Sequence, residues 1–275
     1  MKANQTAWIF TYYDNNDLSA VLKRIQPGDS IIAVDSGLDL LLKYRIMPRM
    51  VIGDFDSLSP QSKALLRHCP DLQASEISES DYDSLSNREI YRSVNCPDDH
   101  HLEEQLNIIQ ARPEKDETDT ELAVEWCLQN QFTTINLINS MQNRFDHCTG
   151  IISILENAFD KGVQIKVISA GQEIFFSQKE QPLDYNTGLT FSLCPVSDTV
   201  KGVKTENCVY PLNEETLYRT KTRGISNIIH SENAGICFES GKLLVIIQLG
   251  AEPESLSEAV PLSYNHSAES GDINA

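Results

Sequence analysis

The sequence has 275 residues, and its 40 Asp and Glu outnumber its 22 Lys and Arg, giving a formal net charge of −18. An acidic chain has no general attraction for phosphodiester backbones, which argues against nucleic acid as a partner. Seven cysteines without paired spacing, and no leader-like or membrane-spanning apolar run, favour a soluble cytoplasmic protein with reduced thiols and no membrane partner.

The N-terminal part of the chain alternates between short apolar strands and helical patterns. Strands are predicted at residues 7–12, 30–35 and 50–54, with a helix at 37–46 between the last two. These strands are apolar at successive positions and would be buried on both faces. Such a pattern is typical of a parallel sheet that helices cover on either side.

A stretch rich in Ser, Asp and Glu at about residues 71–112 interrupts this alternation. It is interpreted as a partly ordered acidic insertion, with a short helix near residues 102–110. The pattern then resumes with a helix at 117–130 that Thr118 or Asp119 caps, a strand at 133–139, a helix ending at Gly162 and a strand at 163–170. An α/β domain is therefore predicted over residues 1–170.

The remaining chain changes character at about residue 172. Short apolar or alternating runs follow one another, broken by Gly, Pro, Asn and Ser, and no long helical pattern lies between them. An all-β unit, a β-sandwich, is therefore predicted for residues 172–250. The last segment, 251–275, is acidic, without Lys or Arg, and is expected to be a disordered tail.

Carboxylates follow the predicted strands of the α/β half. Asp35 ends one strand, Asp54 and Asp56 follow another, and Asp116 and Asp119 stand at the start of a helix. Ligands of open parallel sheets bind beyond the carboxyl ends of the strands, so these side chains are expected to converge. Converging carboxylates repel one another, and Mg²⁺ resolves this by binding their oxygens and bridging to phosphates.

Cations and a further acidic group lie close to these carboxylates in sequence. Lys115 and Arg144 are candidates to meet phosphate charge, and Asp146 and His147 follow another strand. Structural roles remain open for several of these residues: Asp119 can cap its helix, Arg144 and Asp146 can form an ion pair, and His147 can simply pack. In the same way, Asp56 with Ser57 can form a turn.

Five segments in order resemble the thiamine pyrophosphokinase family. They span residues 33–60 with the motif GDFDS, 114–126 with KDETD, 143–155 with RFDH, 209–217 with VYPL, and 223–227 with SN. The resemblance covers most of residues 7–250 and leaves out the acidic insertion and the tail. It implies an α/β nucleotide- and metal-binding catalytic domain followed by a thiamine-binding β-sandwich.

The activity that the resemblance implies is transfer of pyrophosphate from ATP to thiamine, giving thiamine diphosphate and AMP. Mg²⁺ would be the cofactor and ATP the co-substrate. A homodimer with active sites shared between subunits is also implied. The residues expected to take part in catalysis are Asp54, Asp56, Lys115, Asp116 and Arg144. The expected metal ligands are Asp54, Asp56, Asp116 and Asp119.

The same resemblance implies a set of binding residues for nucleotide and thiamine. Asp35 would lie beside the nucleotide, Asp146 would bind the aminopyrimidine of thiamine, and Tyr210 would stack on thiamine, although Tyr210 also fits a half-buried sandwich aromatic. The complete set is Asp35, Ser36, Ser57, Asp119, Asp146, His147, Tyr210, Ser226 and Asn227.

Three departures from the family pattern bear on function. Ser36 replaces a glycine of the family's D-G-G motif, the glycines before RFDH are absent, and the segment before VYPL lacks a glycine. An unusual backbone is expected at Asn143, where the family often has glycine. Two alternatives therefore remain: a pyrophosphokinase with another acceptor, such as a hydroxymethyl-pterin, or a non-catalytic protein that binds thiamine or nucleotide.

Overall fold

The computed structural model describes residues 5–13, 18–67, 92–94, 106–111, 114–142, 144–169 and 171–249. Most of the predicted acidic insertion, Asn143 and the whole predicted tail at 251–275 lie outside these residues. Among the described helices, none combines the length and the apolar character that crossing a bilayer requires.

Six parallel strands form the N-terminal part of the main sheet. They are buried along nearly their whole length, as expected for strands covered on both faces. Their bounds are β1 Thr6–Phe10, β2 Ser30–Val34, β3 Met50–Gly53, β5 Leu106–Gln110, β6 Thr134–Ile138 and β7 Gln164–Ile168. The order is β7-β6-β1-β2-β3-β5, so the chain leaves β1 toward one side and later returns to its other side at β6.

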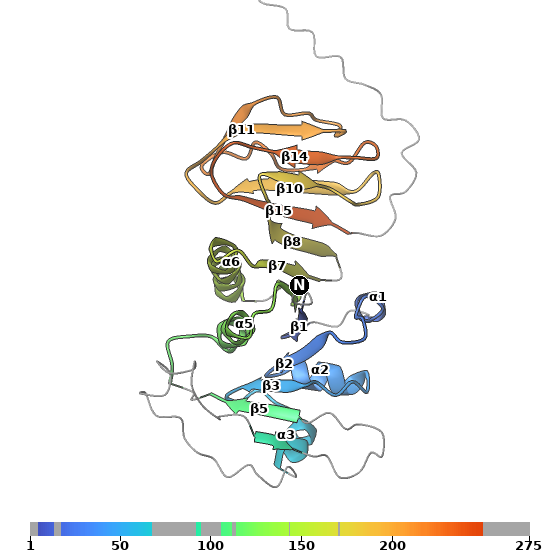
Figure 1. Ribbon diagram of the computed structural model, residues 1–275, viewed down its shortest axis with the longest axis vertical. Coiled ribbons are helices and arrows are strands. Elements are labelled where there is room, and N and C mark those ends of the chain that lie inside the picture. Colours follow the sequence, from blue (N-terminus) through green and yellow to red (C-terminus); the bar gives the residue numbers. More distant parts are fainter. Residues whose placement is uncertain are drawn as a thin grey trace, which may run out of the picture.

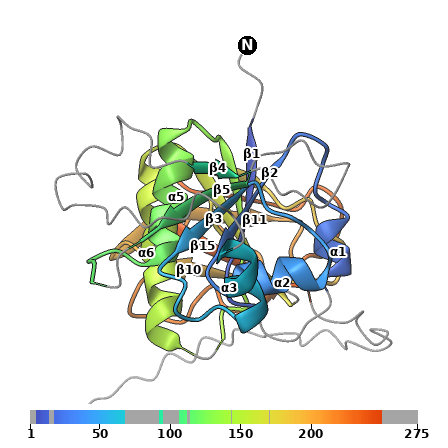
Figure 2. The same cartoon turned by 90° about the horizontal axis from the view of Figure 1, so that it is seen from below.

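Helices cover both faces of this parallel sheet (Figures 1 and 2). The helices α5 and α6 lie on one face, and α1, α2 and α3 on the other. Each face has its own apolar core, in which Leu122 and Ile154 represent one and Leu38 and Leu41 the other. The bounds are α1 Ser19–Leu22, α2 Gly37–Lys43, α3 Pro60–Arg67, α5 Asp119–Gln129 and α6 Phe145–Asp160.

The helix predicted near residues 102–110 is wrong over its second half, because residues 106–110 form the strand β5. Its residues pair in parallel with β3, with Val51 beside Ile108. The alternate residues Leu106 and Ile108 face one core cluster and Ile109 the other, which is a strand period rather than a helical one. A short antiparallel strand, β4 Arg92–Val94, closes this edge of the sheet.

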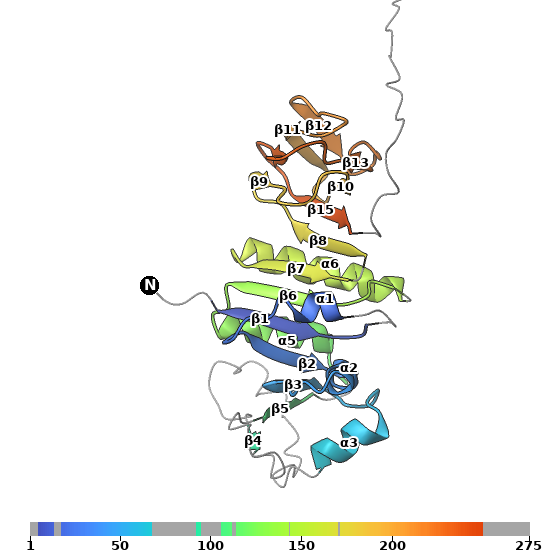
Figure 3. The ribbon, with the colours of Figure 1, turned by 90° about the vertical axis from the view of Figure 1, so that its right-hand side faces the viewer.

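Beyond β7 the main sheet continues as antiparallel strands, which Figure 3 shows as an unbroken succession. These strands are β8 Gln172–Phe176, β15 Leu243–Gln248, β10 Thr190–Pro195 and β13 Asn227–Ile228. A second sheet, in the order β12-β11-β14-β9, consists of β9 Glu180–Pro182, β11 Thr199–Glu206, β12 Glu215–Tyr218 and β14 Gly235–Cys237. A third apolar core, including Phe191, Leu193 and Val245, fills this β region. The predicted fold class, a parallel α/β part followed by an antiparallel β part, is confirmed.

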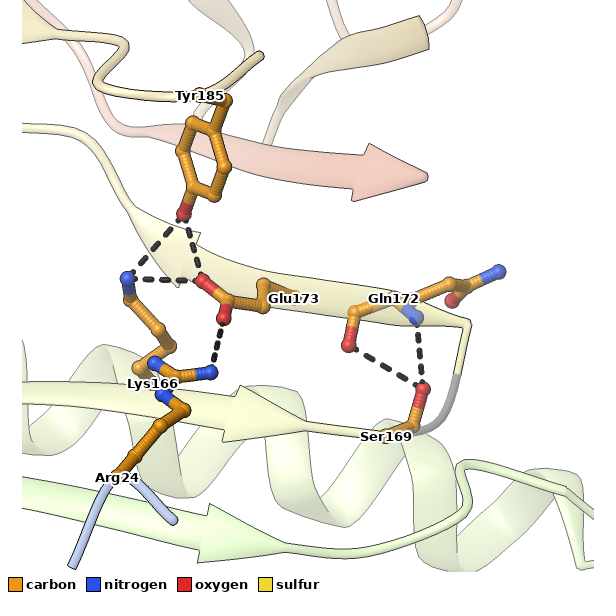
Figure 4. A network of polar contacts seen from close by, with 6 residues as sticks. All are labelled: Arg24, Lys166, Ser169, Gln172, Glu173 and Tyr185. Carbon is orange, nitrogen blue, oxygen red and sulfur yellow. Dashed lines mark hydrogen bonds and ion pairs between the residues drawn. The ribbon is translucent and has the colours of Figure 1, made fainter. Parts of the chain in front are cut away.

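The two parts meet where β7 pairs with β8, and a buried carboxylate marks this junction (Figure 4). Glu173 Oε1 accepts a hydrogen bond from Arg24 Nη1 at 2.6 Å, and Glu173 Oε2 accepts one from the Tyr185 hydroxyl at 2.6 Å and lies 2.9 Å from Lys166 Nζ. Burial acts to raise the pKa of Glu173, but Tyr185, Lys166 and Arg24 hold it below its usual value. Charged groups from both parts of the chain therefore stabilise the junction.

Candidate functional site

A cleft of about 480 Å³ opens at the carboxyl ends of β1, β2, β3 and β6. Strand β1 stands between β2 and β6, so the cleft lies at the point where the strand order reverses. Open α/β sheets bind their ligands at this position. The residues that line it are Thr11, Tyr12, Val34, Asp35, Ser36, Ser57, Thr118, Asp119, Thr120, Asn139, Asp146, His147, Gly150, Ile151 and Ile154.

Asp35 follows β2 in a left-handed conformation, with a φ of 44°. Its carboxylate accepts a hydrogen bond of 3.4 Å from the backbone N–H of Phe55. A Cβ added to Gly53 would lie only 1.9 Å from Asp35 Oδ1, so the glycine of GDFDS provides the space for this carboxylate. Gly53 itself has a φ of 152°, which also favours glycine.

Three carboxylates converge at this end of the sheet. Asp35, Asp54 and Asp119 each place one oxygen so that the three oxygens lie within 4.8 Å of one another. Burial and the neighbouring charges of Asp119 and Asp54 raise the pKa of Asp35 to about 7. Three clustered carboxylate oxygens are the donor set that a hard divalent cation such as Mg²⁺ prefers.

Lys115 and Asp119 form an ion pair at the edge of this cluster, with 3.0 Å between Lys115 Nζ and Asp119 Oδ1. Both side chains are largely buried, at 7% and 16% exposure. Lys115 therefore neutralises part of the Asp119 charge, while the Asp119 side chain also lines the cleft. The donor set therefore fits a cation with one partly neutralising lysine beside it.

The start of α5 decides between the two predicted capping residues. The Thr118 side chain accepts a hydrogen bond of 3.2 Å from the backbone N–H of Glu121, so Thr118 is the N-cap. Asp119 is the first residue of the helix, and its carboxylate turns into the cleft. The Thr118 cap thus fixes the start of α5 and with it the position of Asp119, the candidate metal ligand.

Two of the predicted metal ligands lie outside this group of three. Asp56 and Asp116 are exposed, and neither lines the cleft. The backbone N–H of Asp56 donates to Asp54 Oδ1 at 3.1 Å, and the backbone carbonyl of Asp56 accepts from Lys63 Nζ at 2.8 Å. Both of these hydrogen bonds of Asp56 are therefore made by its backbone, not by its carboxylate. Between the two aspartates, the Phe55 ring packs against an apolar core.

Arg144, Asp146 and His147 stand at the start of α6, and Asp146 and His147 line the cleft. The guanidinium of Arg144 binds the Asp146 carboxylate through two hydrogen bonds, of 3.2 Å and 2.5 Å. The Arg144 bonds lower the pKa of Asp146 to about 2, although both side chains are exposed. A second cleft of about 350 Å³, which includes Arg144 and His147, adjoins the first. The predicted ion pair is therefore present, on the surface of a binding cleft.

Several cleft residues were not singled out by the sequence. Asn139 follows β6 and lines both clefts; its side chain donates to Thr11 Oγ1 at 2.7 Å and accepts from the Met141 N–H at 2.7 Å. Met141 has a φ of 51°, which is a left-handed backbone conformation. The sequence predicted such a conformation at Asn143, two residues later, which lies outside the described residues. Only the position of Asn139 after a predicted strand pointed to it.

The substitution of Ser36 for a family glycine falls at a tolerant position. Ser36 has a φ of −58°, which any residue adopts, and it lines the cleft. By contrast, a Cβ on Gly37 would lie 1.9 Å from the carbonyl oxygen of Phe10. Of the two glycine positions in the family's D-G-G motif, the close approach of α2 to β1 therefore requires glycine only at the second, which is Gly37.

Apart from Asp146, the residues predicted to bind thiamine lie in the β region. Tyr210 is 57% exposed, and its backbone exchanges hydrogen bonds with the buried Asn227 side chain, at 3.0 Å and 2.8 Å. Ser226 precedes Asn227 with a φ of 59°. None of the three lines either cleft. Within one chain, the structure holds these residues together with one another but not with the carboxylates.

Comparison with known families matches the two parts of the chain to two models. Residues 22–167 match "Thiamin pyrophosphokinase, catalytic domain", and residues 173–245 match "Thiamin pyrophosphokinase, vitamin B1 binding domain". The two matches meet at the junction between β7 and β8.

Individual relatives agree with these matches. A thiamine pyrophosphokinase of Bacillus subtilis (strain 168) is 27% identical over 218 residues, covering 78% of this chain and 85% of the relative. The crystal structure of thiamine pyrophosphokinase from Bacillus subtilis matches with a TM-score of 0.70 at 23% identity, covering 89% of this chain and 99% of the other. Thiamin pyrophosphokinase from Candida albicans matches with a TM-score of 0.65 at 17% identity, covering 90% of each chain.

Proposed function

The chain belongs to the thiamin pyrophosphokinase family, and from this premise we propose that Asp35, Asp54 and Asp119 hold the Mg²⁺ on which its reaction depends. Membership makes the chain an ATP-dependent thiamine diphosphokinase. The single observation that supports the metal site is the convergence of three carboxylate oxygens within 4.8 Å at the strand ends.

The reaction moves a pyrophosphoryl group between two oxygens. The hydroxyl oxygen of thiamine forms a bond to the β-phosphorus of ATP, and the bond from that phosphorus to the oxygen shared with the α-phosphate breaks. AMP leaves with that oxygen, and the hydroxyl proton is released. Positioning and charge neutralisation supply most of the rate in such transfers, and Mg²⁺ bound by the carboxylates would neutralise phosphate charge.

The chain's own cations complete the proposed site. Lys115 lies beside Asp119, and from there its ammonium group would meet phosphate oxygens. Arg144 lines the adjoining cleft and offers a planar guanidinium to a second phosphate. Asp146, ionised down to low pH by its pairing with Arg144, would receive the aminopyrimidine of thiamine, whose molecule as a whole is a cation.

We further propose that the working protein is a homodimer in which Tyr210, Ser226 and Asn227 of one copy face the carboxylate cleft of the other. The support is their placement: none lines the clefts of its own chain. Tyr210 is 57% exposed, and its group has further exposed apolar neighbours in sequence, namely Val209 and Ile225, at 42% and 50% exposure. Burial of such side chains against a second copy would stabilise the dimer.

AMP release from ATP tests this function. The full chain is incubated with ATP, MgCl₂ and thiamine, with parallel reactions that replace thiamine by a hydroxymethyl-pterin or omit any acceptor. Release that needs both Mg²⁺ and thiamine is expected. Release only with the pterin would assign the other acceptor. Background release with every acceptor, while thiamine still binds in calorimetry, would identify a binding protein.

A further inference from the structure

Asp39 connects two helices behind the carboxylate site. It lies in the first turn of α2, between the buried residues Leu38 and Leu41 in sequence. Its Oδ2 accepts a hydrogen bond of 3.0 Å from the backbone N–H of Ser59, and its Oδ1 accepts from the hydroxyls of Ser59 and Ser62. Ser62 is only 1% exposed, so the Ser62 end of this contact is buried, while Asp39 and Ser59 are half-buried.

The two serines also begin α3. The hydroxyl of Ser59 accepts a hydrogen bond of 3.2 Å from the backbone N–H of Ser62 while it donates to Asp39. Pro60 is the first helical residue, where proline needs no hydrogen-bond partner. Although partial burial acts to raise it, these hydrogen bonds hold the pKa of Asp39 below its usual range, so the carboxylate is charged beside a helix N-terminus.

The loop of residues 54–58 joins β3 to this contact and carries Asp54. One end of the loop is fixed by the last residue of β3, Gly53, and the other by Ser59. Lys63 Nζ, one turn into α3, donates to the carbonyl of Asp56 at 2.8 Å. We call Asp39, Ser59, Ser62 and Lys63 the α2–α3 clasp. None of the clasp residues lines the cleft, so the clasp contacts the loop without taking part in the cleft itself.

We propose that Asp39 and Lys63 are positioning residues that hold the 54–58 loop so that the Asp54 carboxylate stays beside Asp35 and Asp119 before a cation binds. Three carboxylate oxygens within 4.8 Å repel one another in the metal-free protein. An unrestrained Asp54 would turn toward water, and each binding event would then have to bring it back. The clasp lowers this cost by fixing the Ser59 end and the middle of the loop, while β3 fixes the Gly53 end.

This inference rests on the proposed function, because it assigns a role in cation binding at that same site. The role of the clasp is in the metal-free protein, where an activity assay does not detect it. The amide hydrogens of residues 54–58 should exchange slowly in the wild-type protein without metal, and faster when the clasp is broken.

The test compares Asp39→Asn, Ser59→Ala and Lys63→Met with the wild-type full chain. Mn²⁺ binding is measured by titration calorimetry, amide exchange by mass spectrometry on metal-free protein, and turnover at a series of MgCl₂ concentrations. Loss of hydrogen bonds to a charged group should raise the Mn²⁺ dissociation constant and the half-saturating Mg²⁺ concentration about tenfold. The kcat at saturating Mg²⁺ should stay close to wild type, and Ser59→Thr, which keeps the hydroxyl, should restore binding.

Asp29→Asn is the matched control. Asp29 also accepts two hydrogen bonds that tie segments together, from Trp8 Nε1 at 2.8 Å and from the Gln26 N–H at 2.9 Å, and it lines neither cleft. The Asp29→Asn variant should have a lower melting temperature than wild type, with unchanged Mn²⁺ affinity and unchanged amide exchange at residues 54–58.

Two outcomes would overturn the inference. One is unchanged Mn²⁺ affinity and unchanged exchange in all three clasp variants, while wild type turns over with Mg²⁺. The other is a loss in Asp29→Asn equal to that in Asp39→Asn, which would make the effect one of general stability. A wild-type protein that binds no Mn²⁺ and releases no AMP would instead reject the proposed function.

Discussion

At the scale of single residues, the geometry of GDFDS depends on a missing side chain. Gly53 has room for no Cβ, because the Asp35 carboxylate occupies that space at 1.9 Å. Gly53 is the last residue of β3 and Asp35 directly follows β2, and these two strands pair in parallel so that their last residues meet at the same edge. Glycine at position 53 therefore leaves space for the Asp35 carboxylate and also permits the positive φ of its own backbone.

Gly53→Ala should consequently disable the site. The added methyl group has to displace Asp35, and the positive φ adds backbone strain. We expect thiamine-dependent AMP release to fall about 100-fold or more, the scale on which misplaced catalytic groups lose rate. Steady-state kinetics measure this, with circular dichroism as the control for folding. A folded variant with wild-type kinetics would contradict the packing argument.

The two aspartates of the same motif should differ when each is changed. Asp54 belongs to the group of three converging carboxylates, whereas Asp56 is exposed and hydrogen-bonds through its backbone. Asp54→Asn should lower kcat/KM by about 100-fold or more, and Asp56→Asn should have a smaller effect. Mg²⁺-dependent kinetics of both variants check this order. Equal losses would show that Asp56 also reaches the metal.

At the scale of elements, the sequence predicted those whose pattern is local. The strands around residues 7–12, 30–35 and 50–54 and the α5 helix follow from apolar spacing and a capping threonine, so each was visible without the fold. Strand β5 was not, because its five residues end a long acidic stretch and gain their strand identity from pairing with β3. Tertiary pairing, rather than local preference, decides such a segment.

The same distinction applies to the site. Asp35 and Asp54 were predicted because each follows a strand, and strand ends meet at one edge. Which of Asp116 and Asp119 turns inward depends on the helix cap at Thr118, and spacing alone left both open. Asn139 was missed because its role arises from contacts with Thr11 and Met141, which lie on other segments or in an unusual backbone.

The stability of the junction between β7 and β8 is expected to depend on pH through Glu173. Glu173 has a folded pKa below its usual 4.5. Its charge therefore stabilises the fold fully above a pH of about 4.5, and this contribution is lost as the pH falls through the folded pKa. Glu173→Gln leaves Lys166 and Arg24 without their counter-charge and should lower the free energy of unfolding at pH 7 by about 3–5 kcal/mol.

Urea unfolding at a series of pH values measures this effect. The difference between wild type and Glu173→Gln should be largest at neutral pH and should shrink below a pH of about 4.5. The control is Glu215→Gln, which breaks the exposed ion pair with Arg223 and should cost less than about 1 kcal/mol. A difference that stays constant down to acidic pH would show that the charge of Glu173 does not stabilise the junction.

At the scale of the whole molecule, one chain separates the two groups of residues that the proposed site combines. The carboxylates lie at the strand ends of the parallel part, and Tyr210 and Asn227 lie in the β region outside both clefts. A continuous sheet runs between the two parts through the β7–β8 pairing, so folding the β region back onto its own cleft would break that pairing. In the proposed dimer, a second copy would offer the missing residues without such a rearrangement.

Mixed dimers distinguish a shared site from a site within one chain. Asp54→Asn removes a carboxylate, and Tyr210→Ala removes the aromatic group; each variant alone should be nearly inactive. When both are co-expressed with different tags, half of randomly formed dimers combine the two chains, and one of the two sites in such a dimer is intact. Activity should then return to about a quarter of wild type, measured as thiamine-dependent AMP release.

Asp54→Asn co-expressed with Asp119→Asn is the matched control. Both changes lie in the parallel part, so every shared site formed from these two chains lacks a carboxylate and activity should not return. If the Asp54→Asn and Tyr210→Ala mixture likewise shows only the sum of its inactive parts while the tagged chains purify together, each chain must carry a complete site. The β region would then have to approach its own cleft, against the continuity of the main sheet.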